Sequence, residues 1–117
     1  MKTVTFQLKG EYIDQIKSGS KVKEYRYPSD YNIKRLCYPC DIDKVSSNVI
    51  GFEMEDEFWI PRKDLTHVQF FNGYRKNRKE LVCELKSIKI VEDPEGETPG
   101  EDFFVLSLGK VIKSKNF

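Results

Sequence analysis

The sequence predicts a β-rich α+β domain with one or two short helices. Eight Phe, six Tyr and one Trp stand in a chain of 117 residues, and such side chains favour strands. Residues 3–8 alternate, with Val4, Phe6 and Leu8 on one face, as a half-buried strand does. Residues 12–19 instead carry apolar side chains at helical spacing and end at Gly19, a residue that commonly closes helices.

Length and composition predict a single soluble domain over residues 1–117. A chain of this size buries a core without disulfides or metal, and three cysteines is an odd number for a disulfide framework. No apolar run is long enough to span a membrane, and the chain starts directly in a strand pattern. We therefore expect a cytoplasmic protein with reduced thiols and no membrane partner.

Charge is segregated along the chain although its formal net value is only +1. Residues 1–40 carry eight Lys or Arg against four Asp or Glu, and residues 71–91 carry six against two. Residues 41–70 carry three against seven, and residues 92–102 carry none against six. The segregation predicts one electropositive face, as in proteins that bind anionic partners.

The most unusual stretch follows the predicted helix. Lys21, Lys23 and Arg26 surround Glu24 on a segment that otherwise has the pattern of a strand. One interpretation is a solvated edge strand whose lysines prevent aggregation. The other is a cationic cleft in which Glu24 orients a neighbouring cation against an anionic ligand. On a regular strand Lys21 and Glu24 face opposite ways, so they meet only if Lys21 lies in the turn or the strand is bulged.

The remaining elements follow from local patterns. Ser29 or Asp30 is expected to cap a helical turn that ends near Leu36. Further strands and loops are predicted as follows: strands at 49–52, 58–60, 67–71, 81–90 and 103–108, and loops at 44–48 and 93–102. The acidic residues 53–57 are expected at the tip of a hairpin, as a solvated charge cluster.

Residues 72–79 combine a turn signal with charge. Asn72-Gly73 is the strongest short turn signal in the chain, and Tyr74 follows it beside four cations that include Arg75. One interpretation is an exposed loop kept soluble by its charge. The other is a loop that contacts phosphates while Tyr74 stacks on a base.

No metal site or cofactor is predicted. Cys37 and Cys40 have the spacing of a ligand or redox pair, but only Cys83 and His67 remain elsewhere as soft or nitrogen ligands. Pro39 and the acidic residues that follow do not provide the helix that a redox pair needs. We expect all three cysteines and His67 to be structural.

Several of these segments together resemble the ASCH family. The pieces are Gly-x-Lys-x-x-Glu-x-Arg at 19–26, the aromatic helical turn at 31–36, Asn-Gly-Tyr at 72–74, the strand at 81–90, and Leu-Gly-x-Val-Ile at 108–112. They stand in the family's order and cover most of the chain except an insertion-like segment at about 37–64. The resemblance implies a PUA-like small β-barrel with one or two short flanking helices.

The resemblance also implies an RNA- or nucleotide-binding module that uses a basic cleft. The expected nucleic-acid-binding residues are Lys21, Lys23, Arg26, Arg35, Asn72, Gly73, Tyr74 and Arg75. The alternative is a small hydrolase acting on RNA or on an acylated cytidine, with Lys21 and Glu24 as catalytic residues. Glu24 would keep a nearby Lys21 charged, which disfavours Lys21 as a base. Binding is therefore preferred, and enzyme activity stays open.

Overall fold

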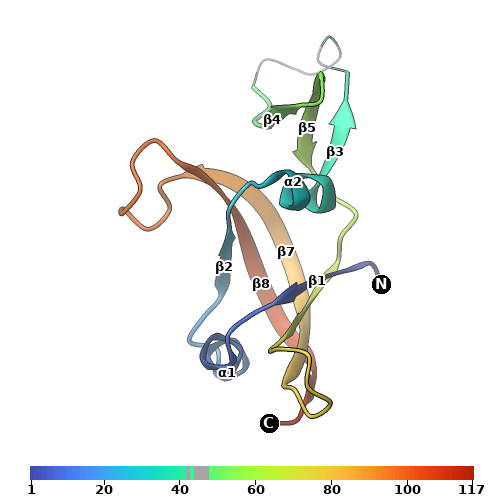
Figure 1. Ribbon diagram of the computed structural model, residues 1–117, viewed down its shortest axis with the longest axis vertical. Helices are drawn as coiled ribbons and strands as arrows, with labels where there is room; N and C mark the ends of the chain where they lie inside the picture. The colour runs from blue at the N-terminus through green and yellow to red at the C-terminus, as the bar shows by residue number, and fades with distance from the viewer. Residues whose placement is uncertain (42, 44–47) are drawn as a thin grey trace. The chain divides into compact units, whose positions relative to one another are not determined.

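The computed structural model describes residues 1–41, 43 and 48–117. Strands make up nearly half of these residues, so the predicted β-rich α+β class is confirmed. The elements in chain order are β1 (Thr3–Gln7), α1 (Gly10–Ser18), β2 (Lys23–Arg26), α2 (Asp30–Leu36), β3 (Cys37–Cys40), β4 (Phe52–Met54), β5 (Glu57–Pro61), β6 (His67–Phe71), β7 (Glu80–Glu92) and β8 (Asp102–Lys115) (Figure 1).

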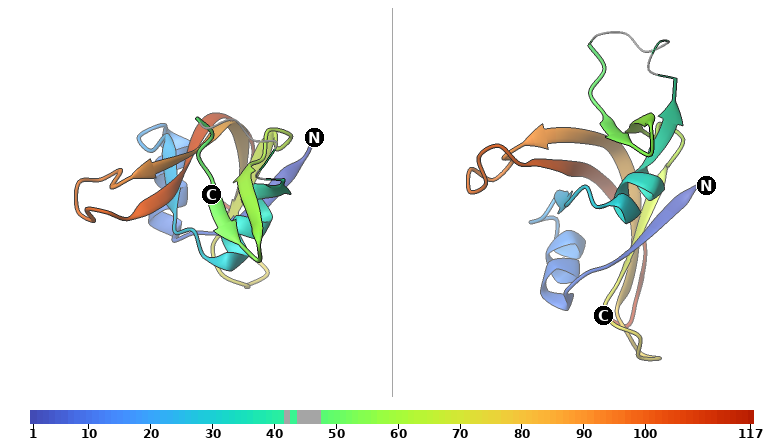
Figure 2. Two further views of the ribbon diagram at one scale, coloured as in Figure 1. Left: turned by 90° about the horizontal axis from the view of Figure 1, so that it is seen from above. Right: turned by 45° about the horizontal axis from the view of Figure 1, so that its top comes forward.

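The described strands form two sheets. Five of them follow the order β1-β6-β7-β8-β2, and this sheet is mixed because β1 runs parallel to β6 while β6 runs antiparallel to β7. The other three form an antiparallel sheet in the order β3-β5-β4. The two longest strands, β7 and β8, lie side by side (Figure 2).

The chain divides into two compact units. The first contains residues 1–24, 64–87 and 107–117, and the second contains residues 25–63 and 88–106. The insertion-like segment at about 37–64 supplies the three-stranded sheet of the second unit. The single domain expected over 1–117 stays a prediction.

The core of the first unit is built from the alternating faces of its strands and one face of α1. Val4 and Phe6 are buried on β1 as predicted, and the Phe6 ring lies 6.4 Å from that of Phe70 on β6. The two buried side chains of α1 are Ile13 and Ile16. Each such side chain contributes roughly 1.5–3 kcal/mol to folding. The buried apolar residues of this unit are Val4, Phe6, Ile13, Ile16, Leu65, Val68, Phe70, Leu81, Val82, Cys83, Leu85 and Leu108.

The second unit has its own aromatic core. Phe52 on β4 meets Phe104 on β8 edge to face at 5.4 Å, and Trp59 on β5 is buried. The Trp59 indole donates a hydrogen bond to the Met54 carbonyl at 3.0 Å, which ties the hairpin together. Ser29 caps α2 by accepting a hydrogen bond from the Asn32 N–H, as the sequence predicts.

Three elements differ from the sequence-based expectation. β3 was not predicted, and it tolerates Pro39 because it lies at the edge of its sheet, where a missing N–H leaves no neighbour unpaired. β7 and β8 both extend beyond the predicted 81–90 and 103–108. The loop predicted at 44–48 lies, apart from Asn48, outside the described residues. Neither described helix is long and apolar enough to cross a membrane.

Candidate nucleic-acid interface

Lys21 and Glu24 form an ion pair in the first unit. Lys21 Nζ lies 3.5 Å from Glu24 Oε1, and the side chains are 18% and 8% exposed. Glu24 is the one charged or polar residue that is buried in the described part of the chain. A buried carboxylate is costly unless it is paired, so the Lys21 ammonium stabilises the fold as well as being a candidate functional group.

The two side chains meet because Lys21 lies in the turn before β2. Gly19 ends α1 with φ +86°, and the Lys21 N–H then donates to the Gln15 carbonyl at 3.1 Å. β2 begins only at Lys23, so strand alternation does not apply to Lys21. The sequence allowed two ways for Lys21 to reach Glu24, a place in the turn or a bulge in the strand. The structure has Lys21 in the turn. Lys23 itself is exposed.

The loop between β6 and β7, residues 72–79, is longer than a two-residue hairpin. The Asn72 N–H donates to the Lys79 carbonyl at 3.1 Å and closes the loop. Gly73 adopts φ +72°, a backbone conformation that side chains rarely take. A Cβ added to Gly10 would lie 2.7 Å from Asn72 Nδ2, so the loop lies close to the start of α1.

Tyr74 is held at the surface of this loop. Its side chain is 83% exposed, and its ring meets that of Phe71 edge to face at 6.3 Å. The Arg78 guanidinium carbon lies 4.1 Å from the centroid of the Phe71 ring. Arg78 also donates to the Gly73 carbonyl at 3.3 Å and to Glu80 at 2.8 Å. The loop thus presents an aromatic ring next to a positioned guanidinium.

Helix α1 brings charged side chains to this loop and the end of the chain brings an aromatic ring, and sequence reasoning missed both. Lys79 pairs with Asp14 of α1 at 2.7 Å. The ammonium groups of Lys17 and Lys79 lie 4.1 and 5.5 Å from the Phe117 ring centroid. These residues are about 40 to 100 positions apart, so no local pattern could have grouped them. In the sequence, the site was signalled only by the turn and tyrosine at 72–74 and the basic run at 75–79.

The electrostatics of the loop are dominated by cations. The hydrogen bond and charge of Arg78 hold the pKa of Glu80 below its usual value, and the charges of Lys115 and Lys113 act in the same direction. Lysines near the end of β8 therefore face the same carboxylate as the loop does. Cations from the loop and from β8 thus act on one carboxylate at this end of the first unit.

The predicted site residues of the first unit fall into two groups on different sides of α1. The Lys21 ammonium lies 5.6 Å from the Tyr12 ring centroid, whereas Asp14 and Lys17 face the loop and Phe117. At 100° per residue, Tyr12 projects from α1 on the side opposite to Asp14 and Lys17. A ligand shared by the two groups stays a prediction.

Two predicted residues belong to the second unit. Arg26 is the last residue of β2 and is partly buried. Arg35 lies in the last turn of α2, where its guanidinium carbon is 4.9 Å from the Tyr31 ring centroid. Neither belongs to the loop surface of the first unit.

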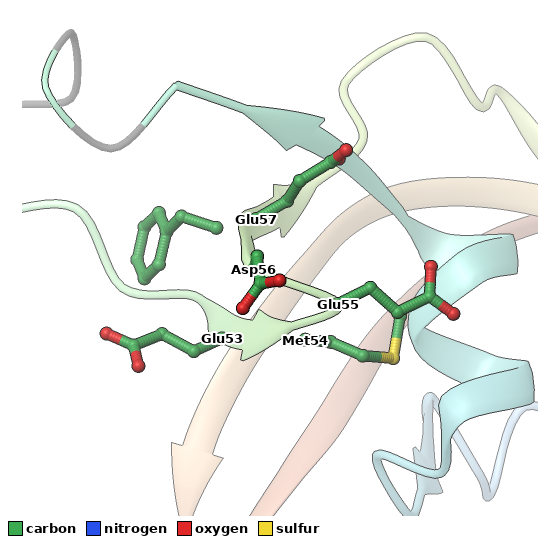
Figure 3. A pocket seen from close by; sticks show the side chains of 6 residues that line it. Glu53, Met54, Glu55, Asp56 and Glu57 are labelled. Atoms are coloured by element: carbon green, nitrogen blue, oxygen red, sulfur yellow. The ribbon is translucent and has the colours of Figure 1, made fainter.

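An open hollow of about 450 Å³ lies at the acidic hairpin of the second unit and is lined by residues 53–58. The carboxylates labelled in Figure 3, on Glu53, Glu55, Asp56 and Glu57, point in different directions. Glu55 instead pairs with Lys34 at 2.7 Å. Among the described residues, no three His, Cys, Asp or Glu side chains are grouped so that they could hold a metal ion.

The cysteines and the histidine have local structural contacts. Burial raises the pKa of the Cys37 thiol to about 12, which leaves it protonated at neutral pH. The Cys40 thiol donates to the Phe58 carbonyl at 3.1 Å. His67 Nδ1 lies 2.7 Å from Thr66 Oγ1 at the start of β6. These contacts agree with the structural interpretation of the three residues.

No protein-family model, curated protein or solved structure matches this chain. The resemblance to the ASCH family therefore rests on the motifs in the sequence alone. Function has to be inferred from the residues and their geometry.

Proposed function

We propose that this chain binds single-stranded RNA, or a nucleotide-like part of it, through the loop at 72–79. The loop would neutralise phosphates with its cations and stack Tyr74 on a base. Charge contributes sequence-independent affinity, and exposed aromatic rings add about 1–3 kcal/mol for each stacked base.

The observation that carries the proposal is the position of Tyr74. Its ring is 83% exposed yet rests on Phe71, so a partner gains a flat apolar surface that is already oriented. Arg75 is exposed next to it, and Arg78 is fixed over Phe71 by Gly73 and Glu80. The ring and the guanidinium groups therefore lie together on one loop, which is the combination that single-stranded nucleic acid needs for stacking and for charge neutralisation.

The family and the finer fold belong to the same proposal. We infer an ASCH-type module with a PUA-like arrangement of strands. Support comes from the order of elements: an amphipathic helix, a charged strand, a short helix, a strand followed by Asn72-Gly73-Tyr74, and two long final strands. Of the predicted residues outside the loop, Lys21 and Lys23 belong to the same unit as the loop and would add contacts with phosphates.

Fluorescence anisotropy with a labelled single-stranded RNA of ~12 nucleotides tests the loop, since this length matches known single-domain site sizes. Tyr74→Ala is expected to weaken binding by about fivefold or more at any salt concentration, through lost stacking. Arg75→Ala is expected to weaken binding mainly at low salt and to reduce the salt slope by about 0.7 for each lost phosphate contact.

Tyr27→Ala is the matched control, because Tyr27 is 62% exposed but belongs to the second unit. It should leave the affinity within about twofold of the native value. If Tyr74→Ala and Arg75→Ala bind RNA as the native chain does, the loop is not the site and the proposal fails.

A second candidate function is hydrolysis at the Lys21–Glu24 pair. It is favoured by one observation: both side chains reach the same place, with Nζ and Oε1 3.5 Å apart and both largely buried. Glu24 would accept a proton from water while Lys21 stabilises the charge that develops on the attacked phosphate or carbonyl oxygen.

This candidate predicts turnover of RNA or of an acylated cytidine by the native chain. Lys21→Arg keeps the positive charge next to Glu24 and should preserve the fold, while the changed geometry removes most of the turnover. A native chain that hydrolyses neither substrate eliminates the hydrolase and leaves the binding proposal intact.

A further inference from the structure

The second unit exposes aromatic side chains in an ordered arrangement around α2. Tyr31 on α2 is 68% exposed and Tyr38 on β3 is 41% exposed. Large apolar groups that stay at the surface of a small protein mark binding surfaces when they are grouped. The contacts of these two rings show that they are grouped with arginines.

Each of the two rings is covered by a guanidinium. The Arg35 guanidinium carbon lies 4.9 Å from the Tyr31 ring centroid, and that of Arg62 lies 5.3 Å from the Tyr38 ring centroid. Arg62 Nη1 also approaches the Arg35 carbonyl at 3.4 Å. Tyr31, Arg35, Arg62 and Tyr38 therefore form a continuous series, named here the Tyr–Arg row.

Regular backbone structure holds this row in place. Tyr31 and Arg35 are four residues apart on α2 and so share one face of the helix. Leu36 is buried, and its carbonyl accepts a hydrogen bond from the Arg62 N–H at 2.8 Å. The pairing of Tyr38 with Ile60 in the β3–β5 ladder places the second ring. The row is thus oriented before any partner binds.

We propose that the Tyr–Arg row is a stacking site for the unpaired bases of a single-stranded nucleic acid. Tyrosine rings and guanidinium planes both stack on bases, and the two arginines supply charge complementary to the adjoining phosphates. Bases within a duplex are already stacked, so a single strand is the occupant that fits. The site lies in the second unit and shares no residue with the loop at 72–79, so it does not depend on the function proposed for that loop.

The test compares anisotropy of labelled single-stranded RNA, single-stranded DNA and duplex RNA, each ~12 units long, on the full chain. The double variant Tyr31→Ala/Tyr38→Ala is expected to lose about tenfold or more in affinity for single strands. Tyr31→Phe/Tyr38→Phe keeps both rings and should bind within about twofold of the native chain. If the Tyr31→Ala/Tyr38→Ala variant loses affinity for both RNA and DNA single strands, the row recognises the bases. If it loses affinity for RNA alone, the row also recognises the 2′-hydroxyl group. Both outcomes support the row.

Tyr27→Ala again controls for the removal of an exposed tyrosine, because its ring meets Phe103 rather than an arginine. Circular dichroism checks that each variant is folded. If a folded Tyr31→Ala/Tyr38→Ala variant binds single strands with unchanged affinity, the proposal for the row is overturned. A row that binds a protein partner instead would give this same result. If Tyr74→Ala loses single-strand affinity and the double variant does not, the loop is a binding site and the Tyr–Arg row is not. If only the double variant loses affinity, the Tyr–Arg row is a binding site and the loop is not.

Discussion

The loop at 72–79 and the hairpin at 53–57 are both densely charged turns between antiparallel strands. They differ in length, in the residues that take left-handed backbone conformations, and in how their side chains are arranged. The hairpin turns on Glu55 and Asp56 alone, and the acidic side chains labelled in Figure 3 point in different directions. The loop is longer, uses Gly73 for its left-handed residue and holds Tyr74 at the surface between positioned cations.

A run of like charges does not by itself make a binding site. Charge becomes useful when the backbone supplies an oriented surface next to it, as Phe71 and Arg78 do for Tyr74. The hairpin has an aromatic residue too, but Trp59 is turned inward and serves the fold. Four predictions test this contrast between the loop and the hairpin.

The largest effect is expected from the aromatic residues of the two turns. Trp59→Ala should lower the free energy of unfolding by about 3–5 kcal/mol, because it removes a buried indole and its hydrogen bond to Met54. Tyr74→Ala should change it by less than about 0.5 kcal/mol, because the ring is exposed. Urea unfolding followed by circular dichroism measures both, and similar losses would remove the distinction.

The next effect concerns charge. Arg75→Glu/Lys76→Glu should weaken single-stranded RNA binding by about tenfold or more at low salt and flatten its salt dependence. Glu53→Gln/Glu57→Gln is the matched change in the hairpin and should alter affinity by less than about twofold. Equal responses from the two turns would mean that only net charge matters.

Backbone conformation predicts that exchanging glycine and a larger residue changes stability in opposite directions at the two turns. Gly73 has φ +72° and open space around its α-carbon, so Gly73→Ala should cost about 1 kcal/mol through backbone strain alone. Asp56 has φ +61° without being glycine, so Asp56→Gly should stabilise the hairpin by about 0.5 kcal/mol. Thermal unfolding shows whether each variant is more or less stable than the native chain. If both are stabilised or both destabilised, backbone strain at these two positions is not the cause.

The smallest effect is a pH-dependent one at the loop. Arg78 lowers the pKa of Glu80 in the folded state, so this carboxylate adds stability above its unfolded pKa of about 4.5, and that stability is lost as pH falls through the lower folded value. Glu80→Gln should therefore cost less than about 1 kcal/mol at pH 7, because the pair is near the surface.

The cost of Glu80→Gln should disappear in acid, below the folded pKa of Glu80. Urea unfolding at neutral and acidic pH gives the two differences. A cost that persists unchanged in acid would show that Glu80 acts through packing rather than through its charge.

Local patterns were sufficient to predict most elements of this fold. The alternation at β1, the glycine after α1 and the Ser29 cap of α2 are each decided by neighbours within a few residues. β3 was missed because its Pro39 argues against a strand unless the strand is known to be an edge. Edge position depends on β5, about twenty residues further along the chain.

The candidate sites divide in the same way. Local patterns were enough to predict the loop at 72–79, the Gly19 turn and the charges available at each, because turn chemistry and composition are local properties. Three groupings became visible only in the folded chain: Lys21 with Glu24, Lys17 and Lys79 with Phe117, and Arg62 with Arg35 beside two tyrosines. The last two groupings join side chains from distant segments, and the first depends on where one turn ends. The sequence pattern shows neither which distant segments pack together nor where that turn ends. Packing between segments is set by burial of the whole core.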